Sequence, residues 1–491
     1  MPFPYEDIRT FIDECENEDK VVRVKKEVDW NLEAGAIARR LAETGRGRAL
    51  ADGGTPAVVF EKVKGYPDGF RLAGQILASK DRIAKALGYV GSNMKEAMDK
   101  LQDIVLNGMR NPIKPVLVDK KNAPCKQNIM VGDDINLYKF PAPMIHDGDG
   151  GRYMHTWGFV ITKDRDSEWV NWGTYRSMIA DRKTLTGIIE PQQDIGKIRQ
   201  KYLARKEPMP FAIVVGPDPA SFTIGSTAVL PGQSEGDIAG GIRGKPVLLV
   251  QCETNDLAVP ATAEIVIEGF VHPTKKIWEG PYGEYTGYRA SPRDLRPIYQ
   301  VTAITYRDNP ILTFDPTGTP NADFASSFGD SAMAAEALNR VGIQARVWLM
   351  PESAHTLCVV AVKNVMPNIA TMVKNTLTSQ QGLQSLWTFK FLVVNDDVDI
   401  YDPAEVLWAI STRVHPRRGL IVSDEICGPL TPYASLDERL KKNAPHLTFD
   451  GTWPLDWHPT IAVPPVSSFK SIYPEEIQEK VNKNWEAYGL R

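Results

Sequence analysis

The sequence predicts an α+β protein built from three domains. Its 491 residues exceed what one hydrophobic core usually supports, so more than one domain is expected. Strand patterns dominate the middle of the chain, whereas helix and strand patterns alternate on either side. We therefore place an N-terminal α/β cap at residues 1–115, a β-rich domain at 116–325 and a C-terminal α/β domain with a terminal docking helix at 326–491.

The first domain combines helices with a short strand. Residues 57–60, Ala-Val-Val-Phe, form an apolar run of strand length. Apolar positions at helical spacing predict helices over 31–45, 79–87 and 92–106. The prolines that follow, within residues 111–115, mark the change to the next domain.

The middle domain has the pattern of a β-barrel or a β-sandwich. Short runs of β-branched and aromatic residues alternate with turn residues, which favours these folds over a doubly wound parallel sheet. The predicted strands cover residues 155–162, 211–215, 247–250, 263–268 and 299–306.

The last domain returns to alternating helices and strands. Predicted strands cover 347–350, 356–362 and 389–394, and predicted helices cover 332–341 and a segment that begins at Asp402. A final helix at 474–488 carries one apolar face, which we expect to dock on another domain or subunit. That face comprises Ile477, Val481, Trp485 and Tyr488.

The charge balance and the cysteines narrow the class of protein. Basic and acidic residues number 57 and 61, giving a net charge of -4, so nothing indicates a nucleic-acid surface. The first residues lack a basic segment followed by an apolar core, and no run of about 18 apolar residues occurs, so we expect an unprocessed protein that does not span a membrane. The five cysteines show no paired spacing and are typical of reduced thiols in a cytoplasmic protein.

Two carboxylates lie five residues apart in an aromatic, glycine-rich stretch at 278–288. Pro281 and its neighbouring glycines exclude a helix there, so Glu279 and Glu284 are expected on a shaped loop. The surrounding tyrosines could desolvate the acids and raise the pKa of the deeper one, which would make it a proton donor. The alternative is a surface turn with two solvated glutamates.

A second dense stretch, at 169–176, contains Asn171 and Arg176. The arginine offers a bidentate fork for a carboxylate or phosphate. Asn171, Asp194 and Glu235 together would form an oxygen-only ligand set suited to Mg²⁺ or Mn²⁺. Taken singly, each of the three is as well explained by a helix cap or a solvated side chain.

The motifs, taken together and in order, resemble the UbiD family of decarboxylases that use prenylated FMN. Several motifs in the right order are a strong indication, whereas any one alone is weak. The matching segments are 151–153, 171–176 (Asn-Trp-x-x-x-Arg), 185–187, 254–261, 264–269, 279–284 (Glu-Gly-Pro-x-Gly-Glu) and 484–489.

The resemblance implies both a fold and a catalytic group. Residues 116–325 would form a split β-barrel of the flavin-reductase type that binds prenylated FMN, and the last domain would serve oligomerisation. Arg176, Glu279 and Glu284 would correspond to the catalytic Glu-Arg-Glu group of the family. Glu284 would protonate carbon after CO₂ leaves, while Arg176 and Glu279 hold the substrate carboxylate.

The resemblance also implies a cofactor site. The family holds the flavin phosphate through a divalent metal, Mn²⁺ or Mg²⁺, and a nearby K⁺, with an Asn-His-Glu ligand set. Asn171 and Glu235 match this set, and Asp194 stands where the histidine belongs. An aspartate still supplies an oxygen ligand. Further implied cofactor contacts are Gly173, Thr174, Tyr175, Arg176, Gln193, Ser226, Thr227 and Ala228.

These features predict a carboxy-lyase that reversibly and non-oxidatively decarboxylates an aromatic, heteroaromatic or α,β-unsaturated acid. Its expected partners are the acid and CO₂, a flavin prenyltransferase that supplies the cofactor, and further copies in a homodimer or larger homo-oligomer. Residues 321–324 contain no histidine to engage a ring hydroxyl, which weakens a catecholic acid as substrate. The alternatives are a plain-FMN oxidoreductase and, because of Asp194, a non-catalytic subunit of a carboxylase complex.

Overall fold

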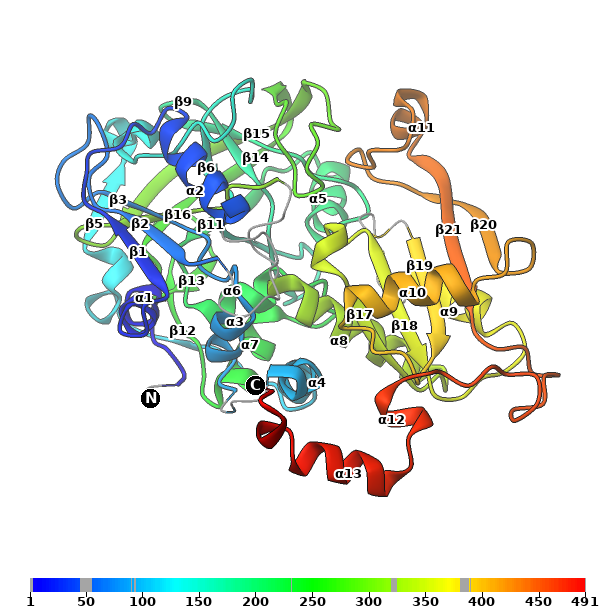
Figure 1. Ribbon diagram of the computed structural model, residues 1–491. Coiled ribbons are helices and arrows are strands. Elements are labelled where there is room, and N and C mark those ends of the chain that lie inside the picture. The colour runs from blue at the N-terminus through cyan, green and yellow to red at the C-terminus, as the bar shows by residue number, and fades with distance from the viewer. Residues whose placement is uncertain are drawn as a thin grey trace.

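A computed structural model describes residues 3–44, 55–89, 91, 94–230, 232–318, 325–379, 388 and 390–490 of the chain. The predicted α+β class is confirmed: a curled antiparallel sheet lies between an N-terminal α/β group and a C-terminal α/β sheet (Figure 1). The exact domain limits remain a prediction.

Four short strands form the N-terminal sheet, and the last of them comes from a distant part of the chain. In spatial order they are β1 (Val21–Val24), β2 (Ala57–Phe60), β3 (Arg71–Gly74) and β16 (Ile311–Phe314). β16 pairs with β3 in parallel, so the chain that leaves the central sheet completes the first one. The helices here are α1 (Ile8–Glu16), α2 (Glu33–Thr44), α3 (Lys80–Ala86) and α4 (Met94–Arg110).

The predicted first-domain elements agree with this part of the structure. The strand at 57–60 is β2, and the helix at 79–87 is α3, whose first turn is capped by Ser79. The expected helix limits at 45 and 92 lie outside the described residues.

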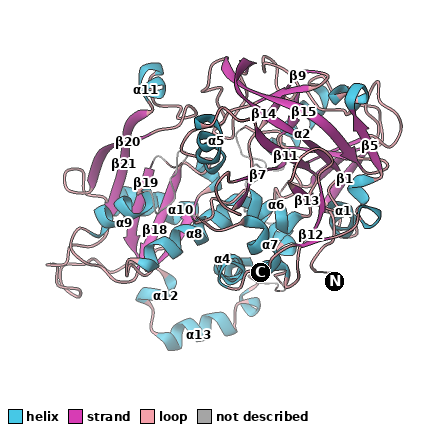
Figure 2. Cartoon of the chain, turned by 180° about the vertical axis from the view of Figure 1, so that it is seen from behind, coloured by secondary structure: helices cyan, strands magenta, loops and turns pink. Residues whose placement is uncertain are grey.

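The central sheet is antiparallel at every one of its pairings and curls around one side of the molecule (Figures 1 and 2). This arrangement agrees with the expected barrel and excludes a doubly wound parallel sheet. Its strands are β6 (Tyr153–His155), β9 (Ser177–Asp181), β10 (Thr184–Thr186), β15 (Asp294–Tyr306), β14 (Ile265–Glu279), β11 (Met209–Val215), β7 (Gly158–Lys163) and β8 (Val170–Gly173), in spatial order, with β5 (Asn128–Val131) added on β15.

β14 is longer than the predicted strand at 263–268 and ends at Glu279. Its register shifts between Val271 and Lys276, and its last residues then pair with the start of β15. The expectation that Glu279 belongs to a loop is therefore wrong. The sheet itself fixes the position of this carboxylate.

Three helices beside the central sheet were not predicted. They are α5 (Asp194–Ala204), α6 (Pro219–Gly225) and α7 (Glu235–Arg243). Glycine lowers the helical propensity of α7, yet Gly240 is needed because a Cβ there would lie 2.2 Å from the carbonyl oxygen of Ile113. A small sheet and short 3-10 turns complete this region: β4 (Val116–Leu117), β12 (Leu248–Gln251), β13 (Ala258–Pro260), η1 (Lys120–Asn122), η2 (Pro124–Lys126), η3 (Gly132–Asp134) and η4 (Leu137–Lys139).

The C-terminal domain is a five-stranded mixed sheet with helices alongside it (Figure 1). In spatial order its strands are β17 (Ala345–Leu349), β18 (Leu357–Val362), β19 (Lys390–Asn395), β21 (Asn443–Gly451) and β20 (Leu420–Ile426). Its helices are α8 (Ala325–Arg340), α9 (Ile369–Thr378), α10 (Pro403–Arg413) and α11 (Leu436–Lys441), with the turn η5 (Pro351–Ser353).

The chain ends in a tail that lies apart from the sheets in both views (Figures 1 and 2). It contains α12 (Phe469–Ile472), α13 (Glu475–Lys483) and η6 (Glu486–Tyr488). Ile477, Trp485 and Tyr488 are 39%, 44% and 52% exposed, so the predicted apolar face is not covered by the described part of this chain. Within the described residues, no helix combines the length and the apolar character needed to cross a membrane.

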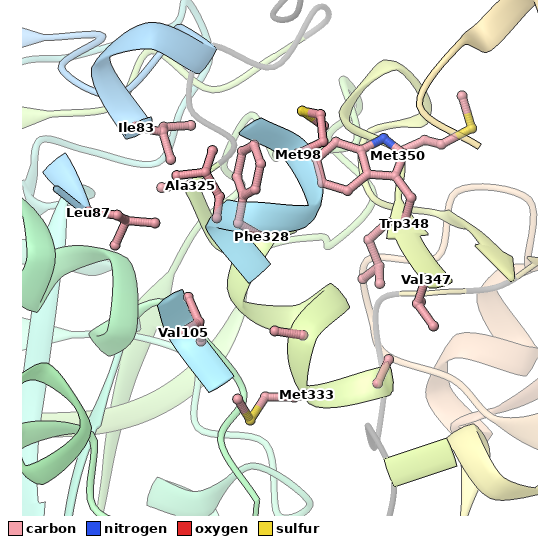
Figure 3. Close-up of a cluster of buried hydrophobic side chains, with 14 of the residues drawn as sticks. Ile83, Leu87, Met98, Val105, Ala325, Phe328, Met333, Val347, Trp348 and Met350 are labelled. Atoms are coloured by element: carbon pink, nitrogen blue, oxygen red, sulfur yellow. The ribbon is translucent and has the colours of Figure 1, made fainter. Parts of the chain in front are cut away.

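A hydrophobic core joins the first and last domains (Figure 3). α4 contributes Met98 and Val105, and α8 contributes Phe328, whose ring meets that of Trp348 edge-on at 5.1 Å between centroids. Trp348 on β17 is fully buried. The C-terminal sheet is thereby anchored beside the central sheet, and the two enclose a cavity.

Candidate active site

A cavity of about 400 Å³ lies where the central sheet and its helices meet the C-terminal domain. Its walls include every predicted site residue except Glu279, which lies behind Arg176. The structure thus brings together residues that are more than 100 positions apart. The predicted residues at the wall are Asn171, Gly173, Thr174, Tyr175, Arg176, Gln193, Asp194, Ser226, Thr227, Ala228, Glu235 and Glu284.

Arg176 joins the two glutamates into one buried group. It lies between β8 and β9, while Glu279 ends β14 and Glu284 lies in the loop that follows. Arg176 Nε donates to Glu279 Oε1 at 3.1 Å, and its Nη1 forms an ion pair with Glu284 Oε1. Glu279 and Glu284 are only 1% and 5% exposed. The expected Glu-Arg-Glu arrangement is therefore present in space, and the surface-turn alternative is wrong.

The two glutamates have different surroundings. Glu279 also accepts a hydrogen bond from the Tyr153 hydroxyl at 2.8 Å. Burial raises the pKa of Glu284 to about 7, because loss of water outweighs the favourable charge of Arg176, and the nearby Glu279 adds to the rise. Glu284 is thus the carboxyl group that can hold a proton near neutral pH.

A histidine and an aspartate hold the loop that carries Glu284. Asp149 accepts the backbone N–H of Gly283 at 3.0 Å, and its other oxygen lies 2.9 Å from His146 Nδ1. His146 Nε2 lies 2.8 Å from the carbonyl oxygen of Thr317. No sequence pattern connects His146 with this loop, because 138 positions separate it from Glu284.

Asn171, Asp194 and Glu235 line one part of the cavity. Asp194 and Glu235 are the first residues of α5 and α7, where the helix dipole favours negative charge. Burial raises the pKa of Glu235 well above its usual value, and the charge of Asp194 adds to this rise. Asp194 is also bound by Lys197 Nζ at 2.8 Å.

This oxygen set fits a divalent cation, because a cation would relieve the repulsion between two carboxylates that share a cavity wall. The described residues contain no cluster of three or more histidine, cysteine, aspartate or glutamate side chains placed for a metal. The Asn-Asp-Glu set has only two such side chains. Metal binding therefore remains a prediction.

Another wall is formed by the end of α6 and the start of α8. Thr227 Oγ1 donates to the Thr223 carbonyl oxygen at 2.8 Å, and the N–H of Ala228 donates to Asp330 at 2.8 Å. Burial raises the pKa of Asp330 to about 7. A Cβ at Gly329 would lie 1.8 Å from Thr227 Oγ1, so only glycine lets α8 approach this closely.

The C-terminal domain contributes cavity residues that the sequence did not reveal. His355, Thr388 and Leu430 reach the cavity from separate segments, together with Ser326 and Asp330 of α8. None belongs to a recognisable motif, so only the fold could bring them to the site. The expected ring-facing segment 321–324 lies outside the described residues.

The fold and this buried Glu-Arg-Glu group define a carboxy-lyase of the UbiD class, and comparison with known families gives the same result. Three family models match in order: the N-terminal domain of 3-octaprenyl-4-hydroxybenzoate carboxy-lyase at residues 12–105, its Rift-related domain at 116–320 and its C-terminal domain at 327–444. These matches cover most of the chain. The chain belongs to the UbiD family.

Curated relatives match over nearly their whole length. The chain is 30% identical to the pyrrole-2-carboxylic acid decarboxylase of Pseudomonas aeruginosa, over 99% of this chain and 98% of that protein. It is 31% identical to ferulic acid decarboxylase 1 of Saccharomyces cerevisiae, with 99% of each chain covered. The chain is therefore similar throughout to enzymes that decarboxylate different acids.

Solved structures that resemble this chain agree with the family assignment. The closed form of vanillic acid decarboxylase from Sedimentibacter hydroxybenzoicus superimposes with a TM-score of 0.85 at 26% identity, covering 99% of both chains. The UbiD-class enzyme HmfF from Pelotomaculum thermopropionicum, in complex with FMN, gives a TM-score of 0.77 at 26% identity, covering 94% of this chain and 97% of that one. Family membership favours the predicted carboxy-lyase over a plain-FMN oxidoreductase or a non-catalytic subunit.

Proposed function

We propose that the protein reversibly and non-oxidatively decarboxylates an aromatic, heteroaromatic or α,β-unsaturated carboxylic acid with prenylated FMN. The observation that carries this proposal is the Arg176 guanidinium held between two buried glutamates at a cavity of about 400 Å³. Such a cavity accommodates a planar acid beside a flat cofactor. A relative solved with prenylated FMN has the same fold, with a TM-score of 0.75 at 25% identity.

The residues divide the chemistry between binding and proton transfer. Arg176 holds the substrate carboxylate, while Glu279, fixed by the Tyr153 hydroxyl, balances the charge of Arg176. When bound, prenylated FMN supplies an acceptor for the electron pair released as the bond to the carboxyl carbon breaks. CO₂ leaves, and Glu284 donates its proton to the carbon left behind. Glu284 then regains a proton from water, and the same path in reverse adds CO₂.

The cofactor would be held by the predicted contacts. Asn171, Asp194 and Glu235 would bind Mn²⁺ or Mg²⁺ at the flavin phosphate, and the 226–228 segment would border the flavin and K⁺. The metal would supply positive charge that offsets the phosphate and both carboxylates. A flavin prenyltransferase would supply the cofactor in the cell.

The decisive experiment uses protein co-expressed with a flavin prenyltransferase and measures CO₂ release from a panel of carboxylic acids. We expect Glu284→Gln to lose about a hundredfold or more in turnover while keeping the modified flavin, because an amide cannot donate the proton. Glu168→Gln is the matched control, since the Glu168 side chain is 93% exposed. Full turnover by a loaded Glu284→Gln protein would refute the proposal.

The cofactor itself separates this proposal from a flavin reductase. We expect activity only after co-expression with the prenyltransferase, with an intact mass and absorption spectrum that differ from those of FMN. An active protein that carries only FMN would contradict prenylated FMN as the cofactor.

We also propose that the protein forms a homodimer or a larger homo-oligomer. The support is the uncovered apolar face of the tail, at Ile477, Trp485 and Tyr488. Sedimentation or light scattering tests this, and Trp485→Glu is expected to shift the particle toward monomer. A monomeric wild-type protein at micromolar concentration would contradict it.

A further inference from the structure

His355 reaches the cavity from the C-terminal domain in an unusual backbone conformation. It follows the turn η5, and both Ala354 and His355 have positive φ angles, 52° and 60°. Residues with side chains seldom adopt this left-handed conformation, and they cluster at ligand sites when the surrounding structure enforces it. The side chain is nevertheless 9% exposed and borders the cavity.

Two serines of α8 orient the imidazole. Nε2 lies 2.9 Å from Ser327 Oγ, whereas Nδ1 lies 3.4 Å from Ser326 Oγ, at the limit of a hydrogen bond. Ser327 is fully buried, and Ser326 lines the cavity. One ring nitrogen is therefore anchored in the protein, and the other is held weakly on the cavity side.

The imidazole lies beside the loop of the proton donor. The ring of Tyr285, the residue after Glu284, has its centroid 6.4 Å from that of His355, at an interplanar angle of 42°. Arg176, Tyr285 and His355 all line the same cavity, so an acid bound at Arg176 shares that cavity with the histidine. Burial lowers the pKa of His355 to about 4, so near neutral pH the ring has one N–H donor and one nitrogen that can act as an acceptor.

We propose that His355 is a specificity residue that accepts a hydrogen bond from a hydroxyl or an N–H group on the substrate ring, with Nε2–H donating to Ser327 and Nδ1 facing the substrate. The inference rests on the proposed function and narrows its substrate class to aromatic acids whose ring carries such a donor. A buried hydrogen-bonding group that is left without its partner costs free energy, so such a site discriminates strongly against analogues that lack the donor.

The experiment compares matched acids with the holoprotein. The pairs are pyrrole-2-carboxylate with furan-2-carboxylate, and 4-hydroxycinnamate with cinnamate. We expect the donor-bearing acid of at least one pair to be preferred by about tenfold or more in kcat/KM. The pair that responds shows whether the donor is a ring N–H or a hydroxyl. His355→Leu should bring this ratio close to one, whereas His355→Gln, which keeps an acceptor, should retain part of it.

Further variants separate recognition from a structural role. Ser327→Ala should lower the ratio without removing the imidazole, and it keeps the test valid if His355→Leu does not fold. His446→Leu is the control, because His446 is a buried histidine of the same domain that does not line the cavity. A purely structural role would slow all acids equally.

The outcomes distinguish the two proposals. Failure of the wild-type holoprotein to release CO₂ from any acid would overturn the proposed function. Turnover with equal use of both acids in each pair, or a ratio that His355→Leu leaves unchanged, would overturn only the role of His355. The same ratio can be measured as relative Kd for the acids on loaded Glu284→Gln protein, which reports recognition without turnover.

Discussion

The guanidinium of Arg176 contacts two glutamates, Glu279 and Glu284, that have different proposed roles. Glu279 is fixed at the end of a strand and accepts hydrogen bonds from Tyr153 and Arg176. Glu284 is buried at the cavity with one arginine contact. Burial is therefore the largest influence on the Glu284 carboxyl group. It raises the pKa to about 7, so Glu284 can hold a proton near neutral pH.

The pH dependence of catalysis should report Glu284. Because the pKa of Glu284 is raised to about 7, the acid is protonated below that pH and loses its proton above it. We expect kcat/KM to fall as pH rises through about 7. Steady-state kinetics from about pH 5 to 9, with a substrate whose own pKa lies below this range, would measure it. A flat profile would contradict Glu284 as the donor.

Tyr153 should matter through Glu279. Tyr153→Phe removes the 2.8 Å hydrogen bond to Glu279 Oε1 and leaves a buried carboxylate with one partner fewer. A hydrogen bond to a charged group contributes about 1.5–3 kcal/mol, so we expect kcat/KM to fall about tenfold to a hundredfold. The exposed Tyr473→Phe is the control. Unchanged kinetics would show that Arg176 alone orients Glu279.

The limits of the sequence are clearest at individual residues. Arg176, Glu279 and Glu284 could be named because they lie in ordered motifs that resemble a known family. His355 could not be named, because its proposed role depends on contacts with α8 of its own domain and with Tyr285 of the central domain. A single histidine in a sequence carries no information about such a contact.

The loop after β14 owes its shape to elements far from it in sequence. Asp149 and His146 bind its backbone and a neighbouring segment, and a Cβ at Gly150 would lie 2.1 Å from the carbonyl oxygen of Gly280. The negative charge of Asp149 also acts on the pKa of Glu284. His146, Arg176 and Glu279 act on the same pKa. The same carboxylate thus positions the donor and helps to raise its pKa.

Asp149→Asn should separate these two effects. It removes a negative charge that raises the pKa of Glu284, while an amide oxygen can still accept the N–H of Gly283. We expect the midpoint of the kcat/KM profile to move to lower pH, with the fold retained. A loss of activity without a shifted midpoint would indicate that Asp149 acts on loop geometry alone.

The sequence predicted most strands but missed the helices that carry two residues of the proposed metal set. Runs such as 57–60 and 211–215 are recognisable because strands bury β-branched residues. α5 and α7 have weak helical patterns, and glycines in α7 follow from close packing that no local rule reveals. Sequence spacing alone could therefore not show that Asp194 and Glu235 converge, although each begins a helix and lines the cavity wall.

The first turns of α5 and α7 should control metal and flavin content together. We expect Glu235→Ala to lose most of its bound metal, because it removes a buried carboxylate from the set. Asp194→His, which restores the ligand set of the family, should keep or increase metal content. Elemental analysis and flavin absorbance of purified protein would measure both. Equal metal content in wild type and Glu235→Ala would contradict the ligand assignment.

The whole molecule matters because the cavity is complete only when the C-terminal domain lies against the central sheet. Lys442 Nζ, next to α11, donates to Glu190 Oε2 at 2.6 Å, and Arg439 donates to the carbonyl oxygen of Ala290. Leu430, from the same part of the chain, lines the cavity. The vanillic acid decarboxylase relative has been solved in closed and open forms, and the chain fits the closed form better, with TM-scores of 0.85 and 0.79.

Lys442 should therefore hold the two domains together over the bound substrate. In Lys442→Ala the Glu190 side chain, 3% exposed, would keep Arg296 at 3.9 Å as its charged partner within the described residues. A buried charge with so distant a partner destabilises the closed arrangement. We expect KM to rise several-fold, about threefold to tenfold, with a smaller change in kcat, because closure precedes chemistry. Small-angle scattering should show a larger radius of gyration. Lys441→Ala is the matched control, since Lys441 is 70% exposed and forms an ion pair with Asp437 on its own helix. If Lys442→Ala changed neither KM nor the scattering profile, the core between α4, α8 and β17 would be sufficient to keep the cavity closed.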